Sequence, residues 1–135
     1  MEKERVMKTM KRIMLQTYVS DAAAAIELYK RAFEAEILEI HHTPEGKVFH
    51  SELDIYGQIL AVADREASDG TNDITGNIMQ FCLHFEEGKE AVVTKAYDIL
   101  SEKGTVRVPL GPCVYSTCMT DIVDCFGVRW CIFTA

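Results

Sequence analysis

The sequence has no hydrophobic run approaching the roughly 18 residues that a membrane-spanning helix needs. Proline, glycine and tryptophan are few, at 3, 8 and 1 of 135 residues, and the composition excludes a collagenous, fibrous or disordered chain. Basic residues are also few: 14 Lys and Arg stand against 21 Asp and Glu, which gives a net charge of −7. Because affinity for nucleic acids is mainly electrostatic, we expect neither a nucleic acid nor a membrane as a partner.

The chain also lacks a CxxC pair, and the spacing of its five cysteines does not match a structural zinc site. No long apolar stretch follows the charged N-terminus, so we expect no secretory signal. An odd number of cysteines then predicts reduced thiols in a cytoplasmic protein. Cys82, Cys125 and Cys131 lie in or beside apolar stretches, and we expect these three thiols to be buried and inert.

What the sequence does contain is a regular alternation of strand-like and helix-like patterns. Residues 12–19 alternate as in a strand, and Ser20-Asp21 offers a helix N-cap. Apolar residues then recur at helical spacing as far as Phe33. Three more strands are predicted, at 36–42, 48–55 and 58–63. This first unit therefore has the order βαβββ.

The same order returns after a polar, turn-rich segment, residues 64–77. The predicted elements are a strand at 78–85, a helix at 90–103 with Gly104 as its stop, and strands at 105–110, 115–120 and 128–134. A four-stranded sheet with one helix cannot bury both faces, so two such units are expected to pair around a shared core or cavity. We predict an N-terminal arm and one domain, with these bounds: arm 1–11, domain 12–135, first module 12–64, connection 65–77, second module 78–135.

Three stretches of the sequence follow motifs of a known superfamily. Residues 25–33 (AIELYKRAF) look like its first helix, residues 50–57 (HSELDIYG) resemble an H-x-x-L-x-I-x-G hairpin, and residues 124–130 (DCFGVRW) resemble a D-x-F-G-V-x-W ending. The chain is therefore similar to the vicinal oxygen chelate superfamily, which includes glyoxalase I, bleomycin-resistance proteins and extradiol dioxygenases. Within it, the chain resembles the PhnB-like branch. The resemblance implies an α+β fold, with paired βαβββ modules forming a curved mixed sheet around a cleft, and a homodimer.

The resemblance also implies where a metal would bind. Enzymes of the superfamily usually hold a divalent ion in the cleft, with one ligand each from the first, fourth, fifth and eighth strands. Carried onto this sequence, those positions fall near Met14, Ala61, Gln80 and Cys131. Since divalent metals prefer imidazole and carboxylate ligands, Met14 and Ala61 are unsuitable. We therefore expect the superfamily's metal site to be absent and predict no cofactor.

His50, Glu52 and Asp54 alternate along one predicted strand and so share one face of its sheet. Two interpretations remain open. In the first, these residues line the cleft, with His50 as a proton donor or metal ligand beside Glu52. In the second, this face is solvated and the apolar residues between them face inward.

Other candidate cleft residues lie on three further predicted segments. Gln16 is on the first strand, Gln80 and His84 share a face of the fifth, and Tyr115 and Cys131 belong to the last part of the chain. His84 is either a cleft imidazole near Gln16 or a hydrogen-bonded, half-buried side chain. The remaining histidines and the large aromatic residues of the last strand are expected to be structural: His41, His42, Trp130 and Phe133.

These observations leave the function open between three classes. The first is a protein that binds a small molecule in its cleft without the superfamily's metal. The second is a metal-dependent lyase or dioxygenase with non-standard ligands, such as Gln16, His50, Glu52 and His84. The third is a structural or regulatory dimer with a filled cavity. The sequence supports no hydrolase, kinase or dehydrogenase motif.

Overall fold

The computed structural model describes residues 8–65, 76 and 78–135 and contains the two predicted βαβββ modules. The first module consists of β1 (Gln16–Val19), α1 (Ala22–Phe33), β2 (Glu36–His42), β3 (Val48–Ile55) and β4 (Gln58–Asp64). The second consists of β5 (Phe81–Phe85), α2 (Glu90–Ser101), β6 (Thr105–Cys113), β7 (Ser116–Val123) and β8 (Arg129–Thr134). Of the predicted connection, only Arg65 and Gly76 fall within the described residues, and of the arm only residues 8–11.

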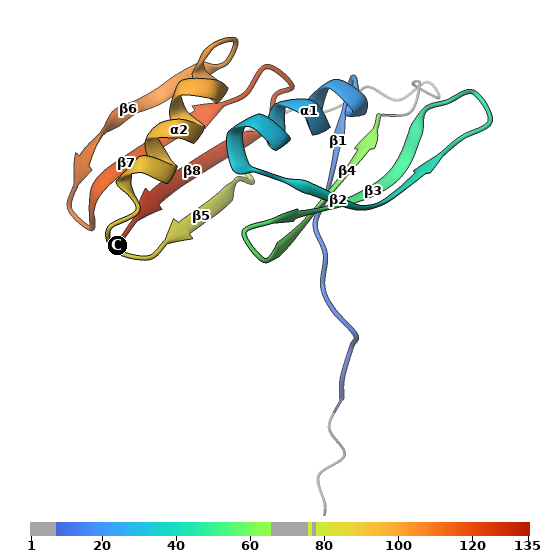
Figure 1. Ribbon diagram of the computed structural model, residues 1–135, viewed down its shortest axis with the longest axis horizontal. Coiled ribbons are helices and arrows are strands. Elements are labelled where there is room, and N and C mark those ends of the chain that lie inside the picture. The colour runs from blue at the N-terminus through green and yellow to red at the C-terminus, as the bar shows by residue number, and fades with distance from the viewer. Residues whose placement is uncertain (1–7, 66–75, 77) are drawn as a thin grey trace, which may run out of the picture.

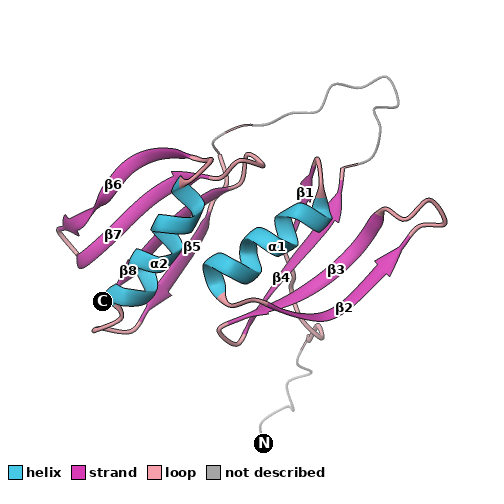
Figure 2. Ribbon diagram, turned by 45° about the horizontal axis from the view of Figure 1, so that its top comes forward, coloured by secondary structure: helices cyan, strands magenta, loops and turns pink. Residues whose placement is uncertain are grey.

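Each module forms its own four-stranded mixed sheet, with the orders β1-β4-β3-β2 and β5-β8-β7-β6. The pairs β1–β4 and β5–β8 are parallel, and the other pairs are antiparallel. In the described part of the chain no strand of one sheet pairs with a strand of the other, and the two mixed sheets with their helices confirm the predicted α+β fold of paired βαβββ modules. The helices α1 and α2 contact each other and join the two modules, as Figures 1 and 2 show.

The predicted bounds are correct for β2 and β3. The predictions for β1, β5 and α2 are too long, and those for β6 and β7 end too early, since these strands reach Cys113 and Val123. β1 begins at Gln16 rather than at residue 12, because only Gln16–Val19 run alongside β4. β5 likewise begins at Phe81, which leaves Gln80 just before the strand. The second helix ends at Ser101. Among the described residues, no helix is long and apolar enough to cross a membrane.

Local sequence signals explain where several elements begin and turn. The Asp21 carboxylate accepts a hydrogen bond from the backbone N–H of Ala24 at 3.1 Å, which confirms the predicted N-cap of α1. Tyr56 and Gly57 form the β3–β4 turn with φ values of 53° and 86°, the left-handed pair that a two-residue hairpin turn requires. Gly104 was predicted as the residue that stops the second helix. The structure gives a different reason for glycine here, because a Cβ at this position would lie 2.5 Å from the Leu100 carbonyl oxygen and clash with it.

One core connects the two modules. Tyr29 and Phe33 of α1 pack on Trp130 of β8, with ring centroids 5.3 and 4.8 Å apart. The buried Asp124 carboxylate accepts hydrogen bonds from the Tyr29 hydroxyl at 2.7 Å and from the Trp130 indole N–H at 2.9 Å. Burial, followed by the nearby Asp124 charge, raises the pKa of Tyr29. The D-x-F-G-V-x-W stretch is therefore a structural junction between the modules.

Candidate functional site

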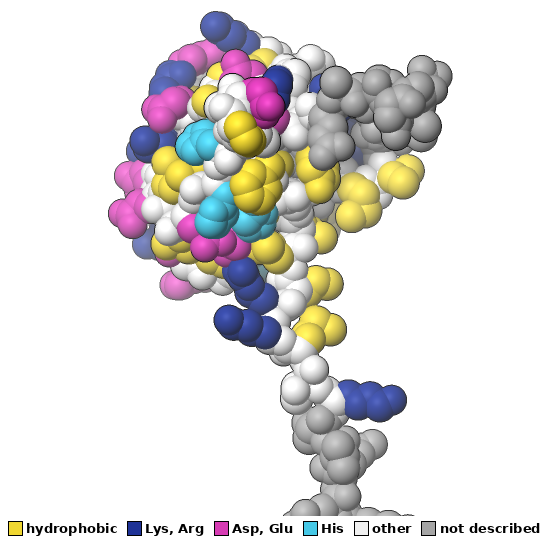
Figure 3. Space-filling view, turned by 90° about the vertical axis from the view of Figure 1, so that its right-hand side faces the viewer, with side chains coloured by type: hydrophobic (Ala, Val, Ile, Leu, Met, Phe, Trp, Pro, Cys, Tyr) yellow, Lys and Arg dark blue, Asp and Glu magenta, His cyan; other side chains and the backbone are white. Residues whose placement is uncertain are grey.

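The polar residues of β3 lie on the face of the first sheet that α1 leaves uncovered. Leu53 and Ile55 of β3 belong to the hydrophobic core beneath α1, so the alternating His50, Glu52 and Asp54 point to the opposite face. Glu52 is only 5% exposed, although α1 does not cover it. Figure 3 views this end of the molecule and shows His side chains beside acidic ones. This face is thus polar without being fully solvated.

A β-bulge in β2 adds Glu39 to this face. Ile37 pairs with Leu53, but the next pair in the register is Glu39 with Glu52, so Leu38 is an extra residue. Strict alternation would have put Glu39 on the same side as Ile37. The shift turns Glu39 toward His50, a position that strand alternation does not predict. The one available signal was the adjacent apolar pair at 37–38, which breaks the alternating pattern of the strand.

Arg12 reaches this face from the segment before β1. Its guanidinium donates to both carboxylate oxygens of Glu52, with N–O distances of 2.5 and 3.0 Å. The hydrogen bonds from Arg12, and then that from His50, hold the pKa of Glu52 well below its usual range. The same ion pair raises the pKa of Arg12. Sequence reasoning gave Arg12 no role, because its partner lies forty residues away on a strand not adjacent to β1.

His50 is held through both of its ring nitrogens. Its Nδ1 lies 2.5 Å from the Gln16 amide oxygen, and its Nε2 lies 2.8 Å from Glu52 and 3.7 Å from Glu39. The Gln16 amide nitrogen in turn donates to the Tyr18 hydroxyl at 2.8 Å. The sequence predicted three of these residues as cleft candidates, Gln16, His50 and Glu52, and the structure brings them together.

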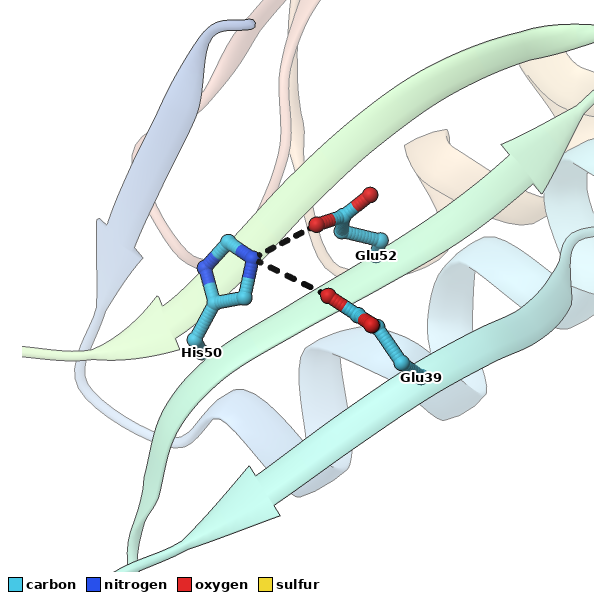
Figure 4. A group of neighbouring side chains, drawn as sticks. All are labelled: Glu39, His50 and Glu52. Carbon is cyan, nitrogen blue, oxygen red and sulfur yellow. Dashed lines mark hydrogen bonds and ion pairs between the residues drawn. The ribbon is translucent and has the colours of Figure 1, made fainter.

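Glu39, His50 and Glu52 are the one group in the described part of the chain whose ligand atoms are close enough to hold a metal ion. Figure 4 shows both carboxylates directed at the same imidazole nitrogen. His41 lies beside the group, with its Nε2 3.9 Å from Glu39, and its ring stacks near that of His50 at 6.3 Å. We call Glu39, His50 and Glu52 the imidazole–carboxylate group.

A pocket of about 500 Å³ lies next to this group at the junction of the modules. Gln16 and Tyr18 of β1 form one side, and Gln80 and Phe81 form the other, together with residues 126–129. Gln16 therefore belongs both to the pocket wall and to the hydrogen bonds around His50. We call this space the junction pocket. It contains two of the predicted cleft residues, Gln16 and Gln80.

The other candidates lie on the second module, away from the imidazole–carboxylate group. The ring of His84 stacks on Phe133 at 4.5 Å, and its Nε2 lies 3.1 Å from the Ala135 carbonyl oxygen. His84 lines a second pocket of about 630 Å³ between β4 and β5. Of the two interpretations given for His84, the hydrogen bond to Ala135 favours the hydrogen-bonded side chain over a cleft imidazole near Gln16. Tyr115 packs edge-on against Phe133, with ring centroids 5.1 Å apart. Phe133 therefore packs against side chains on the outer face of the second sheet and is not part of the core.

The thiols of the second module also differ from expectation. Cys131 is 6% exposed, and burial raises its pKa, as predicted for an inert thiol. Cys82, its direct neighbour across the β5–β8 pair, is exposed, as is Cys125. Cys82 lies on the edge strand β5, whereas Cys131 lies on β8 between β5 and β7. Cys125 lies in the connection between β7 and β8, so the apolar stretches around Cys82 and Cys125 did not predict their exposure. Partial desolvation, with Cys131 and Cys113 nearby, raises the pKa of Tyr115 to about 12.

The positions that the superfamily uses for its metal do not fit one here. Ala61 lies opposite Gln16 in the first sheet, and Cys131 lies opposite Cys82 in the second. Met14 precedes β1 and Gln80 precedes β5, so neither belongs to a strand. Met14 and Ala61 offer no hard or nitrogen ligand, and an amide with one buried thiol is a poor donor set for a divalent ion.

The fold and this site define an α+β protein with two βαβββ modules and a polar face beside their junction. The family model of the Glyoxalase/Bleomycin resistance protein/Dioxygenase superfamily matches residues 10–132, and the chain belongs to this superfamily. A search of curated proteins gave no significant match. The resemblance stated from the sequence is confirmed for the fold.

Solved structures give the same result. The PhnB protein from Bacillus cereus is similar with a TM-score of 0.75 and 21% identity, over 93% of this chain and 100% of that one. Protein PA1353 from Pseudomonas aeruginosa reaches 0.71 at 18% identity, over 91% and 98%. The fosfomycin resistance protein FosX from Listeria monocytogenes reaches 0.64 at 8% identity, over 92% and 90%. These likenesses establish the fold and place it with PhnB-like structures.

Proposed function

We propose that this protein binds a small organic molecule in the junction pocket, without using the superfamily's metal positions. The observation that carries the proposal is the pocket of about 500 Å³ lined by two amide side chains, Gln16 and Gln80, at the junction of two modules. Its volume falls in the range of small-molecule sites, which combine apolar walls with a few polar groups. Ile78, Met79 and Phe81 supply apolar wall here.

The polar groups favour a ligand that carries oxygen atoms at one end. The Gln16 and Gln80 amides can donate hydrogen bonds to such oxygens, and the Arg129 guanidinium lies on the same wall. Arg129 is already held by Asp121 at 2.8 Å, so its guanidinium is fixed in position beside the amides. His50 supports the orientation of Gln16 from behind.

The test is a thermal-shift titration with a panel of small organic acids, alcohols and aromatic carboxylates, in the presence of a chelator. A ligand present at 100 times its dissociation constant stabilises the folded chain by about 2.7 kcal/mol. We expect Gln16→Ala to remove this stabilisation. Gln58→Ala is the matched control, because Gln58 lines the second pocket. Loss of the shift in the Gln58 variant instead, or no shift with any compound, would contradict the proposal.

We also propose that two chains associate beside the junction pocket. Supporting this, five large hydrophobic side chains near the outer edge of β1 are strongly exposed: Ile13 82%, Leu15 50%, Tyr18 58%, Ile78 91% and Met79 68%. Contiguous exposed apolar surface of this kind usually marks an interaction site. In Figure 3 hydrophobic side chains stand out along the segment that leads into the module.

Light scattering after size-exclusion chromatography measures the association directly. We expect the wild-type chain to elute as a dimer and Leu15→Asp to elute as a monomer. Val114→Asp is the control, since Val114 is fully exposed in the β6–β7 turn, away from this surface. A monomeric wild type, or equal behaviour of both variants, would refute the dimer.

A further inference from the structure

We propose that the imidazole–carboxylate group, Glu39, His50 and Glu52, binds one divalent first-row transition metal ion such as Zn²⁺. The group lies on β2 and β3 of the first sheet, whereas the superfamily's metal positions lie on the first, fourth, fifth and eighth strands. The inference does not rest on ligand binding in the junction pocket. Its test uses different variants, so either proposal can fail alone.

The spacing of the three ligand atoms fits a small cation. Zn²⁺ binds nitrogen and oxygen at about 2.0–2.2 Å in tetrahedral geometry, which separates two ligand atoms by roughly 3.4 Å. Here the His50 Nε2 lies 2.8 Å from the Glu52 oxygen and 3.7 Å from the Glu39 oxygen. The separation of about 3.4 Å that tetrahedral Zn²⁺ requires lies between these two distances. A mixed set of imidazole and carboxylate ligands suits borderline ions such as Zn²⁺, Ni²⁺ and Fe²⁺.

The hydrogen bond on the other side of the ring also fits a ligand histidine. The Gln16 amide oxygen lies 2.5 Å from Nδ1 of His50. Because an amide oxygen can only accept a hydrogen bond, Nδ1 carries the proton. Metal-binding histidines commonly donate their second ring N–H to such an oxygen, which fixes the tautomer. Without an ion the Nε2 proton of His50 lies between the ring and the Glu52 carboxylate. A metal ion that displaces this proton would lie between one nitrogen and two carboxylate groups, where a cation is electrostatically favoured.

Arg12 contacts both oxygens of Glu52 but holds Oε2 less closely than Oε1. It donates to Oε1 at 2.5 Å and more weakly to Oε2 at 3.0 Å, and Oε2 is the atom that faces His50. A metal ion on Oε2 therefore competes with only one of the two guanidinium contacts. Two carboxylates and one guanidinium carry a net charge of −1, so the ion would also relieve the repulsion between Glu39 and Glu52.

The bulge in β2 gives the group its third member and its access. The extra residue, Leu38, interrupts the ladder and is 54% exposed, while the Glu39 side chain is 47% exposed. The ion can therefore be approached from solvent. Three protein ligands leave the fourth tetrahedral position free for water or an added ligand, as in open rather than structural sites.

The test is isothermal titration of the full chain with Zn²⁺, comparing Glu39→Gln with Glu36→Gln. Glu36 lies on the same strand and pairs with Asp54 on the same face, so both variants lose the same charge. We expect about one Zn²⁺ per chain, at least tenfold weaker binding in E39Q and no change in E36Q. Binding by the exposed thiols is common to both variants and cancels. Equal affinities, or no saturable binding in the wild type, would overturn the proposal.

Two further measurements locate the ion. We expect Arg12→Gln to tighten Zn²⁺ binding severalfold, because it removes the competitor on Glu52; unchanged or weaker binding would exclude Glu52 as a ligand. We also expect the Co²⁺ form to give visible bands of nitrogen and oxygen ligation. Thiolate charge-transfer absorption would assign the ion to the cysteines of the second module and refute the site.

Discussion

The two modules place different side chains on one backbone frame. In the first sheet Gln16, Ala61 and Glu52 lie side by side across β1, β4 and β3, and in the second Cys82, Cys131 and Asp121 occupy the matching positions. Both acids are held by an arginine, Glu52 by Arg12 and Asp121 by Arg129. These arginine contacts lower the pKa of both carboxyl groups.

The residues around each acid then diverge. Two positions before Glu52 is His50, whereas two positions before Asp121 is Met119. The face of the first sheet is accordingly polar and suited to hydrogen bonding or metal binding. The face of the second carries thiols and stacked aromatic rings. The repeated backbone arrangement therefore places an acidic residue at the same position of both sheets. The side chains beside that residue on its strand determine which contacts the acid can make.

The largest predicted effect concerns the hydrogen bonds of Asp124 at the junction between the modules. Asp124→Ala removes the acceptor of the buried Tyr29 and Trp130 donors. The same change removes the acceptor of two backbone N–H groups, those of Phe126 and Val128. Each donor left without a partner costs about 1–3 kcal/mol, so we expect the free energy of unfolding to fall by roughly 4 kcal/mol in urea denaturation. Asp64→Ala, which removes an acceptor of two backbone N–H groups within the first module, should cost less. A larger loss of stability in Asp64→Ala than in Asp124→Ala would show that contacts within the first module, and not those between the modules, limit stability.

A second prediction compares the residues that enter β2 and β6. Gly104 has two carbonyl oxygens within 2.7 Å of the place where a Cβ would lie, while the equivalent site before β2 is occupied by the buried Ala35. We expect Gly104→Ala to destabilise the chain by roughly 2–3 kcal/mol through overpacking. Ala35→Gly should cost less than about 1 kcal/mol. Thermal denaturation of both variants decides whether the close approach is confined to the second module.

The third prediction uses pH to test the acid of the first sheet. Since Arg12 and His50 lower the pKa of Glu52 in the folded chain, its stabilising effect is present above the unfolded value of about 4.3. It is lost as the pH falls toward the folded value. We expect Glu52→Gln to melt several degrees below wild type at pH 7, with the difference shrinking below pH 4. A difference in melting temperature that does not vary with pH would contradict this assignment.

The smallest predicted effect compares the ends of the two helices. Glu34, at the C-cap of α1, has a left-handed φ of 53°, whereas Glu102 at the C-cap of α2 is right-handed. Glu34→Gly should therefore stabilise the chain by up to about 1 kcal/mol. Glu102→Gly is the control, because each variant loses one exposed ion pair between the helices, with Lys95 or with Arg31. Equal changes in both variants would exclude a backbone origin.

Much of the fold could be read from local patterns. The bounds of β2 and β3, the N-cap at Asp21 and the turn at Tyr56 and Gly57 follow from alternation and turn chemistry within a few neighbouring residues. Errors occurred where an element depends on its partner. The first strand is shorter than its pattern because β4 pairs with only four of its residues.

The candidate site was predicted in part for the same reason. Alternation alone places His50 and Glu52 on one face, and the structure agrees. It could not place Glu39, because the bulge at Leu38 reverses the side on which this residue lies. Nor could alternation show that Gln16 and His84 lie apart, because the two residues belong to strands of different sheets.

By itself the sequence determined the order βαβββ twice, the sharing of a face by His50 and Glu52, and the superfamily motifs. Each of these depends on residues close together in the chain. Only the tertiary structure decided which face α1 covers, that Arg12 reaches Glu52, and that Asp124 joins Tyr29 across 95 residues. The periodicity of a strand fixes its two faces relative to each other, but strand register and helix packing, which depend on distant residues, decide what each face meets.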